Sequence, residues 1–104
     1  MSVNNVDFST LTVAGTALVM ATACSPAMPS QAKGAIITLE DGQIRWRDDG
    51  DAPSSTEGHS LYPTDVLILD SWSVPKVNWR QVLRAIQVIR VTATSGALKI
   101  SWFD

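Results

Sequence analysis

The chain has 104 residues, of which 45% are hydrophobic and 17% are charged, and this size fits one domain around one core. Its net charge of −2 at pH 7 provides no basic surface that would concentrate nucleic acid or anionic lipid. We therefore expect neither nucleic acid nor a membrane among its partners. The low charge content, together with frequent Thr, Ser, Val and Trp, favours a β-domain that keeps part of its surface for contact with other subunits.

The first third of the chain differs in composition from the rest, because residues 1–33 contain only two charges and many small polar residues. We interpret residues 1–16 as an extended N-terminal arm and residues 17–104 as the folded domain. The periodicity of residues 17–24 fits a helix or a buried strand. Neighbouring Thr and Val residues and the Ser-Pro dipeptide that follows favour the strand.

Cys24 is the only cysteine, so no disulfide can form within the chain, and we expect a buried, reduced thiol. The apolar run that ends at Cys24 is similar to a lipoprotein export signal. However, residues 1–10 contain no Lys or Arg and include Asp7, whereas an export signal begins with positive charge. The run is also too short and too rich in Thr, Gly and Ala to span a membrane. The sequence thus predicts a soluble protein made in the cytoplasm.

The clearest local signal is the Asp41-Gly42 dipeptide between the alternating segments 35–40 and 43–47. Such a two-residue loop predicts a β-hairpin, because both turn residues tolerate positive φ. The hairpin would have one core face and one solvent face. The predicted cross-strand pairs are Ile37 with Trp46 and Leu39 with Ile44 on the core face, and Thr38 with Arg45 and Glu40 with Gln43 on the solvent face.

A second hairpin is predicted at the C-terminus, where Ser95-Gly96 would turn between residues 86–91 and 98–103. It would place Ala93 opposite Leu98, Val91 opposite Ile100 and Ile89 opposite Trp102, all on one face.

Between these hairpins, residues 48–58 have the Gly, Pro and Asp content of a surface loop, and Val66–Leu69 forms a short apolar strand. Helical spacing of apolar residues within 79–85 is compatible with one short helical turn. A strand over the same residues is the alternative.

About seven strands with turn signals between them are typical of a sandwich or small barrel. We predict an all-β fold, a single antiparallel β-sandwich that is jelly-roll-like, with an extended N-terminal arm and negligible helix. The expected strands lie near residues 17–24, 35–40, 43–47, 59–62, 66–70, 86–92 and 97–103.

No pattern of residues indicates a catalytic, cofactor or metal site. His59 is the only histidine, and nothing in the spacing brings it to a nucleophile, so we interpret it as a structural or surface residue. One Cys and one His cannot complete a zinc site within the chain. The acidic residues around Gly50 are similar to a calcium loop, but the required Gly and bidentate Glu positions do not match. A solvated turn is the favoured interpretation. A weak cation site that forms only within an assembly is the alternative.

The four tryptophans divide into two groups. Trp46 and Trp102 fall on predicted core faces. Trp72 and Trp79 lie in an irregular segment beside a proline, so each is a candidate for either an interface or the core. Exposed tryptophan could also stack on a sugar.

Residues 34–103 carry a set of motifs that together resemble a small family of virion structural proteins of tailed bacteriophages. The segment 72–87 is longer than the corresponding link of that family. The motifs are an Ile/Thr/Glu strand, Ile44-Arg45-Trp46-Arg47 with a following Asp-Gly and Ala52-Pro53, then Gly58-His59, Val66-Leu67-Ile68-Leu69, and the run from Ile89 to Gly96 with the last strand.

This resemblance implies a β-sandwich protein present in many copies in the virion, as a capsid decoration or cement protein or as a neck or tail component, with no catalytic residues and no cofactor. The implied partners are the major capsid protein or neck and tail proteins, and copies of itself. We expect the arm to add a strand to a neighbour's sheet edge. The candidate contact residues are Phe8, Leu11, Trp72 and Trp79. The alternative of another class is a carbohydrate-binding module for host-surface adsorption that uses Trp72 or Trp79.

Overall fold

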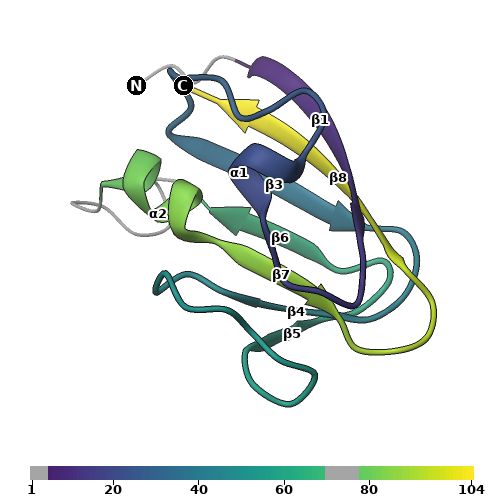
Figure 1. Ribbon diagram of the computed structural model, residues 1–104. Helices are drawn as coiled ribbons and strands as arrows, with labels where there is room; N and C mark the ends of the chain where they lie inside the picture. Colours follow the sequence, from purple (N-terminus) through teal and green to yellow (C-terminus); the bar gives the residue numbers. More distant parts are fainter. Residues whose placement is uncertain (1–4, 70–77) are drawn as a thin grey trace.

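The computed structural model describes residues 5–69 and 78–104, which form two packed antiparallel sheets (Figure 1). Sheet A has the strand order β1-β8-β3-β6, and sheet B has the order β2-β7-β4-β5. The predicted all-β sandwich is therefore confirmed. The elements are β1 (Asn5–Val13), β2 (Leu18–Val19), α1 (Met20–Ala23), β3 (Gly34–Leu39), β4 (Ile44–Arg47), β5 (His59–Leu61), β6 (Val66–Leu69), α2 (Trp79–Ala85), β7 (Gln87–Arg90) and β8 (Gly96–Phe103).

The strand pairs are nested: β1 pairs with β8, β2 with β7, β3 with β6 and β4 with β5. This is the arrangement of one long hairpin rolled up so that alternate pairs fall into opposite sheets. Two further pairings, β3 with β8 and β4 with β7, join these pairs into two four-stranded sheets. Eight strands connected in this way constitute a jelly roll.

The core lies between the sheets and is built from alternate residues of each strand. In β8, for example, Leu98, Ile100 and Trp102 are buried while the residues between them are partly exposed. Sheet B contributes Ile44 and Val88 from the opposite side. Because β8 lies between β1 and β3, its inward side chains are surrounded on both sides.

The predicted Asp41-Gly42 hairpin is wrong, because β3 and β4 belong to opposite sheets. Gly42 has a φ of +67°, but Asp41 does not have a positive φ, and a two-residue hairpin turn of the predicted type requires it at both positions. The chain therefore crosses from sheet A to sheet B. Ile37 and Trp46 meet across the core instead of along a ladder.

The predicted C-terminal hairpin is wrong for the same reason, because β7 and β8 also lie in opposite sheets. Gly96 is the first residue of β8, opposite Val13, so it does not form the turn. The predicted pairs do not form, and β7 buries Val88 instead of Ile89. The two crossings lie side by side, with the Val91 amide donating to the Gln43 carbonyl at 2.9 Å.

Most of the segment expected to be an arm is a strand of the chain's own sandwich. Asn5–Val13 forms β1, which pairs with β8 along its length and buries Ser9, Leu11 and Val13. The period of two, with inward residues alternating with outward ones, explains why this segment is a strand. The division at residue 16 therefore does not separate an arm from a domain.

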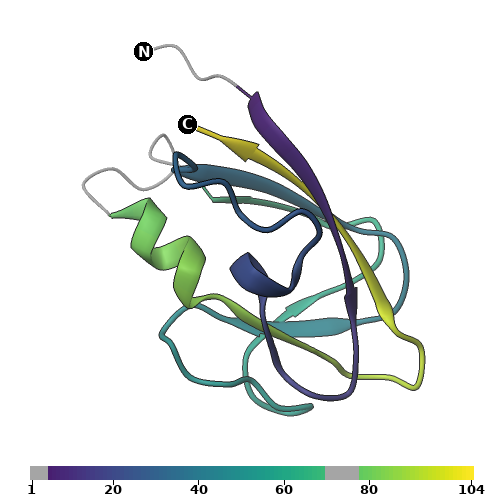
Figure 2. The same cartoon turned by 45° about the horizontal axis from the view of Figure 1, so that its top comes forward.

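Two short helices lie together at one side of the sandwich, in contact with each other (Figure 2). Residues 17–24, expected as a strand, divide into the two-residue β2 and the single turn α1. The helical alternative for 79–85 is correct: α2 begins after Asn78, whose side chain accepts a hydrogen bond from the Gln81 amide at 3.3 Å. Helix content is small but not negligible.

Candidate interaction surfaces

Of the four predicted contact residues, only Phe8 is shown at the surface, with 51% of its area exposed on the outer side of β1. Leu11 and Trp79 are 6% and 8% exposed, and both belong to the core. They are therefore not available to a partner while the domain is folded. Trp72 lies outside the described residues.

The outer face of sheet A carries an apolar surface. In one row across the sheet, Phe8 is opposite Ser101, Ser101 is opposite Ile36, and Ile36 is opposite Ile68. Ile36 and Ile68 are 37% and 49% exposed, and Val66 in the next row is 59% exposed. Exposed apolar side chains on one face make that face a candidate contact surface. We call Phe8, Ile36, Val66 and Ile68 the apolar outer face.

Ile36, Val66 and Ile68 were not among the predicted contact residues, because an apolar strand buried on at least one face does not show whether its other face is exposed. A signal was present in the apolar runs themselves. Adjacent residues of a strand point to opposite faces, so Ile36-Ile37 cannot both enter a core on one side. Val66–Leu69 likewise has two residues on each face.

The four sheet edges are not equally protected against pairing with another chain. At β1, the register is irregular between Asn5 and Asp7, and Thr10 and Ser25 exchange backbone hydrogen bonds of 3.0 and 2.8 Å. At the edges of sheet B, β2 has two residues and β5 has three. By contrast, β6 has four apolar residues and, within the described part of the chain, pairs only with β3. It is the edge most open to strand addition.

The β4–β5 loop, residues 48–58, is hydrogen-bonded to side chains on the outer face of sheet B. Arg45 donates to the Ser55 carbonyl at 3.0 Å and to the Gly58 carbonyl at 2.9 Å. Gln87 donates to the Gly50 carbonyl at 3.1 Å. The two outer faces therefore differ: that of sheet A carries exposed apolar side chains beside Ser101 and Lys99, and that of sheet B is partly hydrogen-bonded to the chain's own loop.

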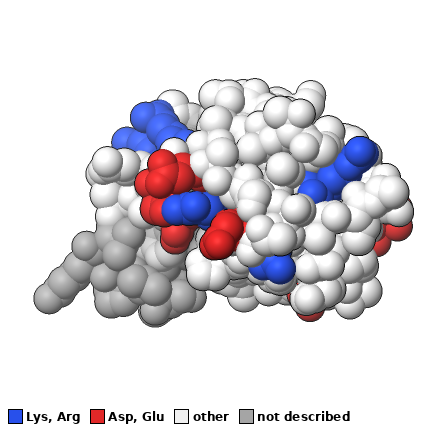
Figure 3. Space-filling model, turned by 60° about the horizontal axis from the view of Figure 1, so that its bottom comes forward, with Lys and Arg blue, Asp and Glu red and all other residues white. Residues whose placement is uncertain are grey.

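Charged side chains gather beside this loop, where Figure 3 shows acidic and basic groups together on an otherwise largely uncharged face. An open hollow of about 330 Å³ lies there, and we call it the charged hollow. Arg47 donates to Asp49, and this bond raises the pKa of Arg47 and lowers that of Asp49. The residues that line the hollow are Arg47, Asp48, Asp49, Glu57, Gly58 and His59.

His59 is exposed, and its ring packs on Trp46 with the centroids 4.7 Å apart and the planes inclined at 41°. This agrees with its interpretation as a surface or structural residue. The described residues contain no group of three or more His, Cys, Asp or Glu side chains that could hold a metal ion.

Cys24 is buried as predicted, and burial is the main reason that the pKa of its thiol is raised. The thiol lies 3.2 Å from the Pro26 carbonyl oxygen. That oxygen also accepts a hydrogen bond from Ser9 at 2.6 Å, and the Ser9 hydroxyl accepts one from the Trp102 indole at 2.8 Å. These groups connect β1, β8 and the chain after α1, which is a structural role.

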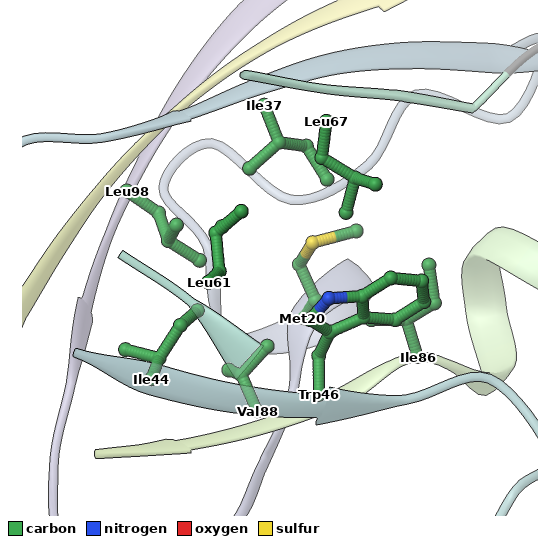
Figure 4. Close-up of a pocket in the computed structure, with 9 residues that line it drawn as sticks. All are labelled: Met20, Ile37, Ile44, Trp46, Leu61, Leu67, Ile86, Val88 and Leu98. Carbon is green, nitrogen blue, oxygen red and sulfur yellow. The ribbon is translucent and has the colours of Figure 1, made fainter. Parts of the chain in front are cut away.

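The space between the sheets is nearly filled. Figure 4 shows apolar side chains converging from both sheets and from α1 on a cavity of about 10 Å³. A volume of this size holds at most about one water molecule. The core therefore offers no ligand site at this position, and the surfaces remain as the candidates for function.

No protein family, curated protein or solved structure matches the chain. Among the described residues, no helix has the length and apolar character needed to cross a bilayer.

Proposed function

We propose that this chain is a non-enzymatic virion structural protein of a tailed bacteriophage, and that it decorates or cements the capsid. The observation that carries the proposal is the apolar outer face on a jelly-roll domain, a fold used by many viral capsid proteins. The motif resemblance of residues 34–103 supports the same role. Fold alone does not define function, so the proposal depends on what this surface binds.

In this proposal the apolar outer face packs on the major capsid protein. Docking would remove Phe8, Ile36, Val66 and Ile68 from water, and the bound copy would connect neighbouring capsid subunits. The core would serve as a rigid support. A position at the neck or tail would use the same surface on a different partner.

A carbohydrate-binding module is the second candidate, because jelly rolls also include lectins. The charged hollow supports it, since carboxylates, a guanidinium and an exposed imidazole stand around one opening. Trp79 does not support sugar stacking, the role expected for it or Trp72, because its side chain is buried.

Co-sedimentation with purified capsids of the encoding phage, followed by heating, tests the capsid role. We expect the wild-type chain to bind and to raise the temperature at which the shells open. Ile36→Lys places a charge in the apolar outer face and should weaken binding at least about tenfold. Ser55→Lys adds the same charge to the loop over sheet B and should bind normally. Binding that is equal in both variants would refute this docking surface.

A glycan array distinguishes the second candidate. A sugar-binding module would show signals that are lost in His59→Ala and retained in Ile36→Lys. Absence of capsid binding together with such signals would replace the virion proposal by the carbohydrate one.

A further inference from the structure

We propose that β6 of one chain pairs antiparallel with β6 of a second copy, so that the two four-stranded sheets A join into one continuous sheet. The observation that carries this inference is the contrast between β6 and the other three edges. Those edges are irregular, hydrogen-bonded or only two or three residues long, whereas β6 is a regular apolar strand with described pairing on one side only. An edge of this kind accepts another strand through its backbone groups.

A second copy fits this edge because the strand complements itself. Two copies of one strand run antiparallel about a twofold axis, and side chains directly opposite each other point to the same face. An axis at Leu67 places Val66 opposite Ile68 of the other copy on the outer face, and Leu67 opposite its equivalent. A shift by one residue would set outward side chains against inward ones. Val66 and Ile68 are 59% and 49% exposed, so both gain contact.

The charges next to β6 weaken this pairing but do not prevent it. The strand itself contains no charged residue, whereas Asp65 precedes it and Asp70 follows it directly in the sequence. The two copies of Asp65 would lie four residues apart along the paired strands, which is about 13 Å. That separation exceeds the screening length of about 8 Å at physiological ionic strength. Each carboxylate also accepts a hydrogen bond from the Tyr62 amide of its own chain at 2.9 Å.

The expected association is weak, because the contact is short. Four residues of strand extend over about 13 Å, so the buried area falls below the roughly 1,200 Å² of standard interfaces. We therefore expect a monomer–dimer equilibrium that is visible at high protein concentration. Copies held on a common surface would pair more readily, because their effective concentration is higher.

Sedimentation velocity of the purified full chain, over micromolar to millimolar concentration, measures the equilibrium. Val66→Lys and Ile68→Lys should each raise the dimer dissociation constant roughly 100-fold, because each removes two apolar contacts per dimer and adds two charges. Phe8→Lys is the matched control, since it places the same charge on the same face at the opposite edge. It should leave the dissociation constant unchanged. Thermal unfolding followed by circular dichroism verifies that the three variants are folded.

Disulfide cross-linking tests the register without a charged variant. A mixture of Val66→Cys and Ile68→Cys chains should form the mixed disulfide in preference to either symmetric one. Cys24 is buried and common to both chains. A wild-type chain that is monomeric throughout, equal weakening by Phe8→Lys, or no preference for the mixed disulfide would overturn the pairing.

The pairing does not require the virion role. A monomeric chain that binds capsids would refute only the pairing, and a dimer that binds no capsid would refute only the virion role.

Discussion

Removal of the Ser9 hydroxyl is expected to destabilise the sandwich far more than a serine-to-alanine change usually does. Ser9 and Trp102 are both fully buried, and the hydroxyl makes two hydrogen bonds. In Ser9→Ala the Trp102 indole N–H loses its partner away from water, which costs about 1–3 kcal/mol. The lost bond to the Pro26 carbonyl adds about 1 kcal/mol. The free energy of unfolding should therefore fall by about 2–4 kcal/mol.

Urea unfolding followed by circular dichroism measures this change, and the melting temperature should fall by roughly 10–20 °C. Ser101→Ala is the matched control, because Ser101 is on the neighbouring strand and points to the outer face. It should change the free energy of unfolding by no more than about 0.5 kcal/mol.

A double-mutant cycle with Trp102→Phe isolates the indole hydrogen bond. Phenylalanine has no N–H to leave unpaired, so Ser9→Ala should cost only about 1 kcal/mol in that background. An equal cost in both backgrounds, or a cost of Ser9→Ala below about 1 kcal/mol in the wild-type chain, would refute the reasoning.

Three further predictions concern the crossings, the thiol and the first strand. In urea unfolding, Gly42→Ala should lower the free energy of unfolding by at least about 2 kcal/mol more than Gly50→Ala. Both glycines have a positive φ, but only at Gly42 would the new Cβ lie 2.7 Å from a backbone atom, the Thr94 carbonyl oxygen. Equal losses of unfolding free energy in the two variants would contradict this. Because burial raises the pKa of Cys24 above 9.0, the native state favours the protonated thiol, so its stabilising contribution is complete below pH 9.0 and is lost as the pH rises towards the native pKa. The difference in unfolding free energy between wild type and Cys24→Ala should change in that alkaline range and stay constant below it; parallel profiles throughout would count against the shift. Deletion of residues 1–16 should abolish the folded state seen by circular dichroism, because it removes β1, and a chain that stays folded would show that this strand is dispensable.

The amino-acid sequence by itself determined the strands after residue 33, but not those of the first third of the chain, where β1 was expected as an arm and residues 17–24 as one strand. Alternation and turn residues located β3 to β8 within a few residues, because the period of two is a local property of a strand with one buried face. The burial of Trp102 and Cys24 also followed from local pattern and residue type. The helix at α2 was identified only as an alternative, since its seven residues carry little periodic signal.

Only the tertiary structure decided which strands pair. Asp41-Gly42 and Ser95-Gly96 both have the composition of hairpin turns, yet both lie at crossings between sheets, where they pack against each other. The jelly roll pairs strands that are distant in sequence, such as β1 with β8, and local turn chemistry carries no information about such partners. The same limit applies to the candidate surfaces. Strand periodicity shows that half of Val66–Leu69 faces outward, but only the sheet order places that strand at an open edge.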